Sequence, residues 1–465
     1  MHLPSAGFSG RLKHAVTGAV DTPLVFLGNF EVENQWALGE PALPRVASHA
    51  GSAVVNRMDE FALLLGGKDD HVVLKTPLDD GYRAYLEGLG LTLPTVHVVA
   101  DQDPQRTVSE DALADPELLR TLSALADDGA RLTAHGISTV EEELAERTGL
   151  RLGAPPAGVC KRVNSKVYSR RLADELGIRQ ARGWACETLD ELADAVTAAG
   201  ELLDAGRKVV VKDAFGVSGK GIVVLDSAKR LARLHRMAVA QAERAAAADG
   251  TSPRTALVIE EWVAKRADLN YQFTVGRDGS THFDFVKELL TENGVHKGHR
   301  MPARLSEEQV AEITRTAHRL GERLHADGYF GVVGVDAMVD PDEGLYPVIE
   351  INARNNMSTY QNVVHEGLAG PDEVAVARHF TVRLDRPLPF AELREVLSGL
   401  LLEERGPRPH GLFVNNYATV NAAATDGADG FEGRLYGVLV AASDDLVGAL
   451  DADITRRLAA HTERS

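Results

Sequence analysis

The chain has 465 residues, of which 50 are Lys or Arg and 68 are Asp or Glu, so its formal net charge is −18. Apolar residues make up 44% and charged residues 25%, a globular composition that excludes disordered and fibrous classes. The acidic charge argues against nucleic-acid and membrane partners, which would be repelled. Two cysteines allow no disulfide framework, and no apolar run approaches the roughly 18 residues of a membrane span. We expect a soluble protein of a reducing cytoplasm.

The first part of the chain alternates short Val-rich runs with amphipathic segments. Runs bounded by Gly, Pro or Asp are typical of strands, and the longer amphipathic segments are typical of helices. This alternation predicts an α/β layer architecture, and Pro155–Pro156 marks its end. We expect an α/β domain over residues 1–155, with strands at 23–28, 71–75 and 95–99 and helices at 108–126 and 139–148.

A second series of strands and helices follows, and a shorter tail ends the chain. The strands are expected at 207–212, 221–225, 256–260, 269–275, 281–286, 331–339 and 345–352. The helices are expected at 163–176, 188–204, 227–247 and 306–325. The tail predicts a helix at 389–404, strand material at 432–441 and a last helix at 443–461. We divide these segments into a core over 156–385 and a small C-terminal module over 386–465.

The segment VDAMVDPDEGLYPVIEINAR carries the most informative pattern. Its DPDEG turn joins two alternating runs and predicts a β-hairpin. If Val339 pairs with Leu345, Asp336 lies opposite Val348, on the same face as Glu350 and Asn352. Carboxylate and amide oxygens on one face suit magnesium, although a solvated polar face is the common alternative. The other face is expected in the core: Val335, Ala337, Val339, Ile349 and Ile351.

A glycine-rich loop follows a buried-looking strand in VVVKDAFGVSGKGIVVL. The strand delivers Lys212, and the loop contains Gly216, Ser218, Gly219 and Gly221. Glycines let backbone N–H groups approach phosphate oxygens, and the lysine adds a positive charge. The loop leads into a strand, so it is not a P-loop. The alternative is an ordinary hairpin turn.

The segment ALVIEEWVAKRADLN is a strand that ends in two acidic residues. The bend from Glu260 and Glu261 through Val263 leaves backbone groups free to hydrogen-bond an adenine. Asp268 could hold ribose hydroxyls. Taken alone, the segment is only a strand end.

Taken together, these segments resemble the ATP-grasp superfamily. Lys166 in VNSK, Lys212 with its loop, EEWV, Asp336 and EINAR occur in the order and rough spacing of that superfamily, over residues 160–365. The resemblance implies an ATP-grasp fold that uses ATP and Mg2+, with Mn2+ as an alternative metal. The implied ATP-binding residues are Lys166, Lys212, Gly216, Ser218, Gly219, Gly221, Glu260, Glu261, Val263 and Asp268. The implied metal ligands are Asp336, Glu350 and Asn352.

Arg354 follows Asn352 at i+2 and resembles the catalytic arginine of the biotin-carboxylase branch. If the strand continues that far, its guanidinium lies on the metal face and could clamp an acyl phosphate through two hydrogen bonds. Lys287 looks like a catalytic lysine on the substrate side, and with Glu288 it is expected to end a strand that points at the same cleft.

The segment HKGHRMPAR is predicted as a cationic loop. In an acidic protein, His299, Arg300 and Arg304 could hold a substrate carboxylate or the γ-phosphate. A solvated loop is the alternative, and the histidines lack the third ligand that zinc needs.

The resemblance implies an enzyme: a carboxylate–amine ligase that forms an amide through an acyl phosphate and releases ADP. The layout is similar to that of the peptide ligases of pheganomycin-type antibiotic biosynthesis. The expected partners are a carboxylic acid or amino acid and an amine or peptide nucleophile, and a homodimer is left open. The alternatives are an L-amino-acid ligase, a carboxylase-like enzyme, or an inactive ATP-binding regulatory protein.

Overall fold

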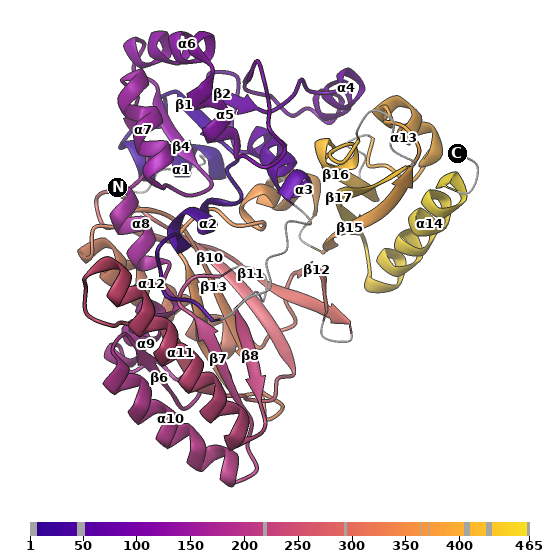
Figure 1. Ribbon diagram of the computed structural model, residues 1–465. Coiled ribbons are helices and arrows are strands. Elements are labelled where there is room, and N and C mark those ends of the chain that lie inside the picture. The colour runs from indigo at the N-terminus through magenta and orange to yellow at the C-terminus, as the bar shows by residue number, and fades with distance from the viewer. Residues whose placement is uncertain are drawn as a thin grey trace.

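The computed structural model describes residues 7–43, 52–216, 221–292, 295–362, 364–370, 372–403, 410–424 and 430–462. These residues form three β-sheets with helices packed against them (Figure 1). Within the described residues, no helix is long and apolar enough to cross a membrane.

The N-terminal part is built on a five-stranded parallel sheet of order β3-β2-β1-β4-β5. Parallel strands are covered on both faces, which explains their apolar runs. The strands are β1 Leu24–Leu27, β2 His71–Leu74, β3 Thr95–Val98, β4 Arg131–Ala134 and β5 Arg151–Leu152. The helices are α1 Phe8–Thr17, α2 Val32–Ala37, α3 Ser52–Asn56, η1 Arg57–Leu64, α4 Asp80–Gly88, α5 Val108–Ala114, α6 Pro116–Asp127 and α7 Thr139–Thr148.

The helix expected over 108–126 is in fact two helices. Asp115 ends α5 in an extended conformation, as the residue before a proline favours, and its side chain caps α6 by accepting from Glu117 N and Leu118 N. Pro116 then occupies the first position of α6, where its missing N–H costs nothing.

The middle part contains a four-stranded antiparallel sheet of order β6-β9-β7-β8. Its strands are β6 Gly183–Cys186, β7 Val209–Asp213, β8 Ile222–Leu225 and β9 Leu257–Glu261. Its helices are α8 Ala157–Val163, α9 Lys166–Glu175, α10 Leu189–Asp204 and α11 Ala228–Asp249. Ser165 caps α9 by accepting from Val167 N at 3.2 Å, so Lys166 begins a helix.

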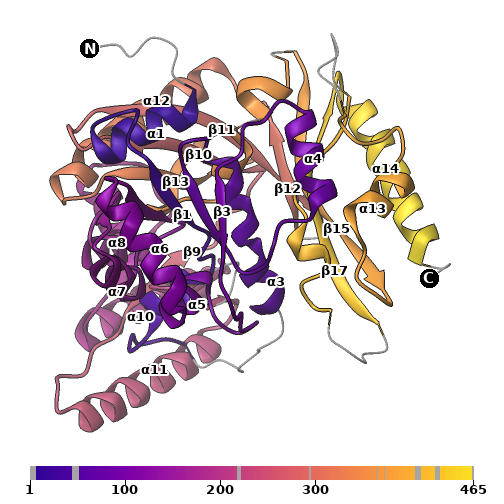
Figure 2. The same ribbon diagram turned by 90° about the horizontal axis from the view of Figure 1, so that it is seen from above.

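An eight-stranded antiparallel sheet of order β14-β13-β10-β11-β12-β15-β17-β16 runs from the expected core into the C-terminal part. Its strands are β10 Ala267–Val275, β11 Thr281–Glu292, β12 Val295–Met301, β13 Gly331–Val339, β14 Leu345–Asn352, β15 Val374–Leu384, β16 Gly411–Asn416 and β17 Phe431–Ala441. The accompanying helices are α12 Glu307–Ala326, η2 Thr359–Gln361, η3 Val364–Leu368, α13 Phe390–Val396, η4 Ala418–Val420 and α14 Asp444–Thr462. Helix α14 covers β15 and β17 (Figure 2).

Strand β12 corrects the expectation of a loop at HKGHRMPAR. It pairs with β11 on one side and β15 on the other, so His299 and Arg300 belong to a central strand. Gly298 permits this pairing, because a Cβ there would lie 1.8 Å from Ala377 O. The basic residues led to the expectation of a loop, but pairing with β11 and β15 makes this segment a strand.

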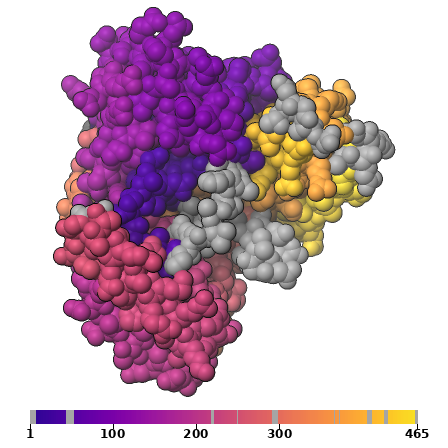
Figure 3. Space-filling model, viewed as in Figure 1, coloured from indigo at the N-terminus to yellow at the C-terminus, as the bar shows by residue number. Residues whose placement is uncertain are grey.

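The N-terminal part packs against both of the other parts (Figure 3). One apolar cluster joins it to the C-terminal strands, and another joins it to β10, β13 and α12. Tyr82 Oη also donates to Val414 O at 3.2 Å, and Glu60 Oε1 accepts from Tyr417 N at 2.5 Å and Ala418 N at 2.8 Å. Residues from all three parts can therefore line the same cavity.

Candidate active site

The hairpin of β13 and β14 carries the expected metal ligands, but in a different register. Val339 pairs with Leu345, as expected, whereas Asp336 lies directly opposite Glu350 rather than Val348. The register shifts between Asp336 and Met338, next to Pro347 on the facing strand, which has no N–H to donate to the ladder.

The same shift changes which residues of β14 enter the core. Val348 is buried at 3% exposure, whereas Ile349 is only partly buried and does not belong to the apolar clusters. The expectation that Ile349 is a core residue was therefore wrong. Val335, Ala337, Val339 and Ile351 are core residues, as expected.

Polar side chains form a continuous row across four neighbouring strands. Glu350 of β14 faces Asp336 of β13, which faces Asn270 of β10, which faces Lys287 of β11. Asn270 Nδ2 donates to Asp336 Oδ1 at 2.9 Å, and Asn352 Nδ2 donates to Asp336 Oδ2 at 3.3 Å. Burial and the facing Glu350 carboxylate raise the pKa of Asp336 to about 6.

This donor set fits a magnesium ion. Two carboxylates that repel each other and one amide oxygen are hard oxygen ligands, and a cation between Asp336 and Glu350 would relieve their repulsion. Magnesium commonly takes one or two carboxylates together with substrate phosphates. The described residues contain no group of three His, Cys, Asp or Glu that could hold a metal, so the site depends on this mixed set.

Helix α9 places two basic side chains between the expected metal and nucleotide residues. Lys166 Nζ lies 2.7 Å from Glu350 Oε1 and donates to Gly216 O at 3.0 Å. One turn later, Arg170 Nη1 lies 3.5 Å from Glu260 Oε1. Lys166 therefore connects the metal residues to the start of the glycine loop.

The other expected nucleotide residues surround the end of β9. Lys212 Nζ lies 2.5 Å from Glu260 Oε2, and Asp268 Oδ2 accepts from Lys265 Nζ at 2.5 Å. Glu261 pairs with Arg207. Within the described residues, the Val263 N–H has no hydrogen-bond partner, so it is available to an adenine.

The glycine loop is described only at its ends. Gly221 has a φ of 79°, a conformation that favours glycine. Ser218 and Gly219 lie outside the described residues.

Arg354 lies beside Asn352, but β14 ends at Asn352, before Arg354. Its Nη2 donates to Asn352 Oδ1 at 3.1 Å and its Nη1 donates to Asn355 O at 3.0 Å. Its Nε donates to Glu33 Oε1 at 2.7 Å, and Nη2 also bonds that oxygen. The edge expected to clamp an acyl phosphate is therefore occupied by Glu33, and one Nη1 N–H stays available within the described residues.

Lys287 does not end a strand, because β11 continues to Glu292. Lys287 is 1% exposed, and its ammonium donates to Gln361 Oε1 at 2.7 Å. No carboxylate pairs with it in the described structure, and burial lowers its pKa well below the usual value. Glu288 points the other way and accepts two hydrogen bonds from the Arg304 guanidinium, at 2.9 and 2.8 Å.

The three expected substrate residues are not brought together as a group. Arg300 holds Asp444 of α14 through two hydrogen bonds of 2.8 and 2.9 Å, and Arg304 is engaged by Glu288. His299 alone lines a cavity that also contains Arg354. Arg300 and Arg304 therefore have structural partners rather than open positions.

The cavity beside Arg354 contains residues that the sequence did not indicate. Its volume is about 360 Å³, and its lining includes Glu33 and His135 from the N-terminal part and Asn415 and Arg434 from the C-terminal part. Their contacts join positions hundreds of residues apart, and neither VENQW nor FVNNY carries a recognisable pattern.

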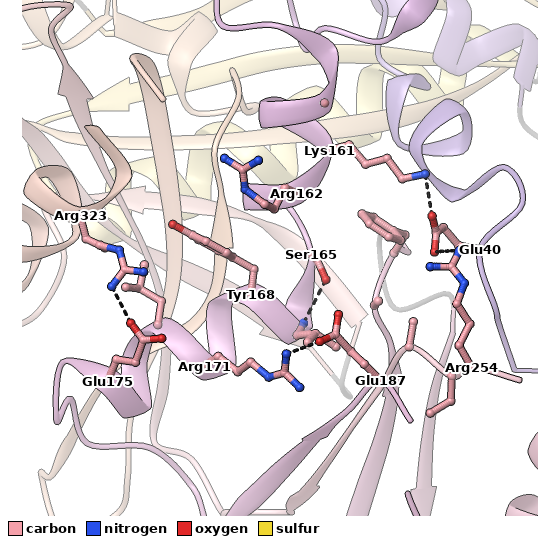
Figure 4. Close-up of a pocket in the computed structure, with 17 residues that line it drawn as sticks. Glu40, Lys161, Arg162, Ser165, Tyr168, Arg171, Glu175, Glu187, Arg254 and Arg323 are labelled. Carbon is pink, nitrogen blue, oxygen red and sulfur yellow. Dashed lines mark hydrogen bonds and ion pairs between the residues drawn. The ribbon is translucent and has the colours of Figure 1, made fainter. Parts of the chain in front are cut away.

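A second cavity, of about 460 Å³, is lined by Tyr168, Arg171 and Glu175 of α9 (Figure 4). Four of its basic residues are held by carboxylates: Arg171 by Glu187, Arg323 by Glu175, and both Lys161 and Arg254 by Glu40. The fifth, Arg162, donates to the backbone carbonyl of Asp327. None of the expected site residues lines it.

Comparisons with known families agree with this fold and site. Residues 58–150 match the pre ATP-grasp domain, and residues 165–377 match the ATP-binding domain of the carbamoyl-phosphate synthase L chain. The chain is an ATP-grasp ligase with a preceding pre-ATP-grasp domain. These matches confirm the ATP-grasp resemblance and the α/β fold class inferred from the sequence.

Two curated relatives show the range of the similarity. The [butirosin acyl-carrier protein]–L-glutamate ligase of Niallia circulans is 26% identical over 70% of this chain and 71% of its own length. A formate-dependent phosphoribosylglycinamide formyltransferase of Synechococcus is 27% identical over 48% of this chain and 49% of its own.

Two solved structures share the fold at low identity. The ADP complex of N5-carboxyaminoimidazole ribonucleotide synthetase has a TM-score of 0.51 and 14% identity, covering 95% of this chain and 98% of its own. Biotin carboxylase from Campylobacter jejuni also has a TM-score of 0.51 and 14% identity, covering 92% and 89%.

Proposed function

We propose that this enzyme joins a carboxylic acid to an amine through an acyl phosphate, and releases ADP and phosphate. The observation that carries the proposal is the continuous group of Lys166, Glu350, Asp336, Asn352 and Arg354. It unites a phosphate-binding cation, two facing carboxylates and a guanidinium at one end of the cleft. Binding ATP alone would not require all five, which argues against an inactive regulatory protein.

Some of the site residues are proposed to bind the nucleotide, and others to bind the substrate. Lys166 and Lys212 neutralise phosphate oxygens, Val263 offers its N–H to adenine, and Asp268 receives the ribose. Positioning and neutralisation are the main tasks, because phosphoryl transfer asks little covalent chemistry of the protein. The glycine loop, including Gly216, Ser218, Gly219 and Gly221, is proposed to cover the phosphates, and Glu260 and Glu261 to border the adenine.

Asp336, Glu350 and Asn352 would hold Mg2+, or Mn2+, which when bound supplies charge neutralisation between the terminal phosphates. The remaining Nη1 N–H of Arg354 is placed to hydrogen-bond the carbonyl oxygen of the activated acid, where negative charge develops as the amine attacks. Lys287 would act on the substrate side through Gln361, which lines the cavity beside Arg354.

The butirosin relative and the three-part layout favour an amide-forming ligase of peptide natural-product biosynthesis over a carboxylase-like enzyme. We propose a small acid or amino acid as one substrate and an amine or peptide as the other, in the cytoplasm. The L-amino-acid ligase is the alternative within the same chemistry. Homodimer formation and the boundaries at 155 and 385 remain predictions.

The experiment that tests the proposal is a screen of pooled carboxylic acids with ATP, magnesium and hydroxylamine, read out as ADP release and hydroxamate formation. We expect a subset of acids to release ADP only when hydroxylamine or another amine is present. ADP release that is independent of any acid, or absent with every acid, would contradict the proposal.

A further inference from the structure

The cavity beside Arg354 is bounded by all three parts of the chain. Its walls come from α2 and η1, from the segment that follows β14, and from β12, β15, β16 and β17. Its volume of about 360 Å³ falls within the range of small-molecule sites. Arg354 lines it whereas Lys166 and Lys212 do not, so it adjoins the acyl side of the reaction and not the nucleotide side.

Within the described residues, three buried side-chain atoms of residues that line this cavity have no hydrogen-bond partner: the oxygens Glu33 Oε2 and Asn415 Oδ1 and the nitrogen Arg378 Nε. Asn415 is only 2% exposed. A buried acceptor without a donor is costly, and folded proteins rarely leave one unless a ligand or water completes it. The two oxygens are acceptors and require a hydrogen-bond donor, whereas Arg378 Nε requires an acceptor.

Glu33 also fixes where that donor would lie. Its other oxygen, Oε1, accepts from Arg354 Nε at 2.7 Å, so Oε2 lies next to the guanidinium proposed to face the reacting carbonyl. An ammonium group on Glu33 Oε2 would be within reach of that carbonyl. His135, which also lines the cavity, does not compete as a cation, because burial and the nearby Arg354 charge lower its pKa well below the usual value.

Strand β17 adds a positively charged side chain to the cavity, opposite in sign to the Glu33 carboxylate. Arg434 lines the cavity, is half-buried, and has no side-chain hydrogen bond or ion pair within the described residues. Arg378 of β15, which also lines the cavity, pairs with Asp451, although its Nε has no partner within the described residues. The cavity therefore presents a carboxylate and an amide oxygen together with one uncommitted guanidinium.

We propose that this cavity is the acceptor site and that it binds an α-amino acid in its zwitterionic form. The proposal rests on the ligase function proposed above. The ammonium donates to Glu33 Oε2, a second N–H of the acceptor donates to Asn415 Oδ1, and the carboxylate pairs with Arg434. The C-terminal part thereby selects the acceptor, and the N-terminal part places its amine.

The chemical step balances with these groups. The ammonium gives one proton to the Glu33 carboxylate, and the freed lone pair attacks the acyl carbon. The new C–N bond forms as the C–O bond to phosphate breaks, and phosphate leaves with the electron pair. The leaving phosphate takes the second proton of the amine, and Glu33 returns its proton to water. Amide, phosphate and one released proton are the products.

The binding test uses three mixtures made from the same L-amino acids: the free amino acids, their C-terminal amides and their N-acetyl derivatives. Thermal melts of the full chain should show stabilisation by the free amino acids, weaker stabilisation by the amides and none by the N-acetyl derivatives. Arg434→Gln should raise the apparent Kd for the free amino acids roughly tenfold and remove their advantage over the amides. Arg236→Gln, an exposed arginine on α11, is the matched control and should change neither.

Equal stabilisation by all three mixtures, or an unchanged preference in Arg434→Gln, would overturn the acceptor assignment. Turnover separates this failure from a failure of the ligase proposal. In Arg434→Gln, the KM for the amino-acid acceptor should rise, whereas Arg236→Gln should leave both that KM and hydroxylamine-dependent ADP release at their wild-type values. Normal hydroxylamine turnover with no change in acceptor KM would overturn the acceptor site alone, whereas the absence of ADP release with every acid would overturn the ligase chemistry itself.

Discussion

Among single residues, Asp336 and Glu350 are two carboxylates that face each other directly across the β13–β14 hairpin. The two carboxylates share a row with Asn270 and lie beside Lys166, and burial raises the pKa of Asp336 to about 6. A folded protein keeps two repelling carboxylates side by side where a bound cation compensates for their repulsion.

Asp336→Asn and Glu350→Gln should each reduce ADP release to below about 1% of wild type, because each removes a charged ligand of the metal. Thermal melts without nucleotide should show no loss of stability, since each change also removes half of a repelling pair. Wild-type rates at saturating magnesium in both variants would contradict the metal assignment. A lower melting temperature would instead indicate a structural role.

Arg354→Ala should strongly lower hydroxamate formation and leave the affinity for ATP nearly unchanged. The reason is that Arg354 contacts Asn352 and Glu33, and not the nucleotide residues. An interaction made mainly in the transition state lowers kcat more than it raises the KM for ATP. Equal losses in both quantities would show that Arg354 binds the nucleotide.

Much of this site was predictable from residue order, because strand alternation places Asp336, Glu350 and Asn352 on one face. The register was not predictable in the same way. The shift beside Pro347 depends on how β14 meets β13, which pairing rules for regular hairpins do not include. The contact between Glu33 and Arg354 could not be predicted from the sequence either, since it joins residues 321 positions apart.

At the scale of elements, β12 shows why composition misleads. Its histidines, lysine and arginine predict a solvated loop, but the strand is central because β11 and β15 flank it. Alternation then sends neighbouring side chains to opposite faces, so Arg300 meets α14 while His299 reaches the cavity. Strand β11 is a neighbour in sequence, but a sequence window cannot reveal the pairing with β15, in which Gly298 lies opposite Arg378.

Arg300→Ala should therefore act on stability and not on substrate binding. The guanidinium is 7% exposed and docks α14 through Asp444, whose carboxylate is half-exposed, so the loss should be about 1–2 kcal/mol of unfolding free energy. Denaturant unfolding measures this loss, and turnover per folded molecule should stay within about twofold of wild type. A raised KM for acid or ATP at unchanged stability would restore Arg300 to the substrate site.

At the scale of the whole molecule, the N-terminal part acts as a bridge between the ATP-grasp sheet and the C-terminal strands. Glu60 of η1 is one of its anchors, since its carboxylate receives two backbone N–H groups from the C-terminal part. The division into three parts follows from the sequence pattern. Their mutual packing does not, because it depends on contacts that no local pattern records.

Burial raises the pKa of Glu60 from 4.5 to about 7. The unfolded state therefore loses this proton first as the pH rises, so the contribution of Glu60 to stability falls between about pH 4.5 and pH 7. Glu60→Gln removes this titration. The melting temperature of the variant, relative to wild type, should rise as the pH is raised from about 5 to about 8, and a difference that is constant with pH would contradict the buried-carboxyl assignment.

In the proposed reaction, the terminal phosphate of ATP, and not the α-phosphate, is transferred to the carboxylic acid. The carboxylates, Lys166 and Arg354 form one connected group beside the β13–β14 hairpin, whereas the open N–H of Val263 follows β9 of the four-stranded sheet. The most direct test supplies ATP, magnesium and an acid selected by the screen, with hydroxylamine as the amine. We expect one ADP and one phosphate for each hydroxamate formed, and AMP with pyrophosphate as the products would rule out an acyl phosphate.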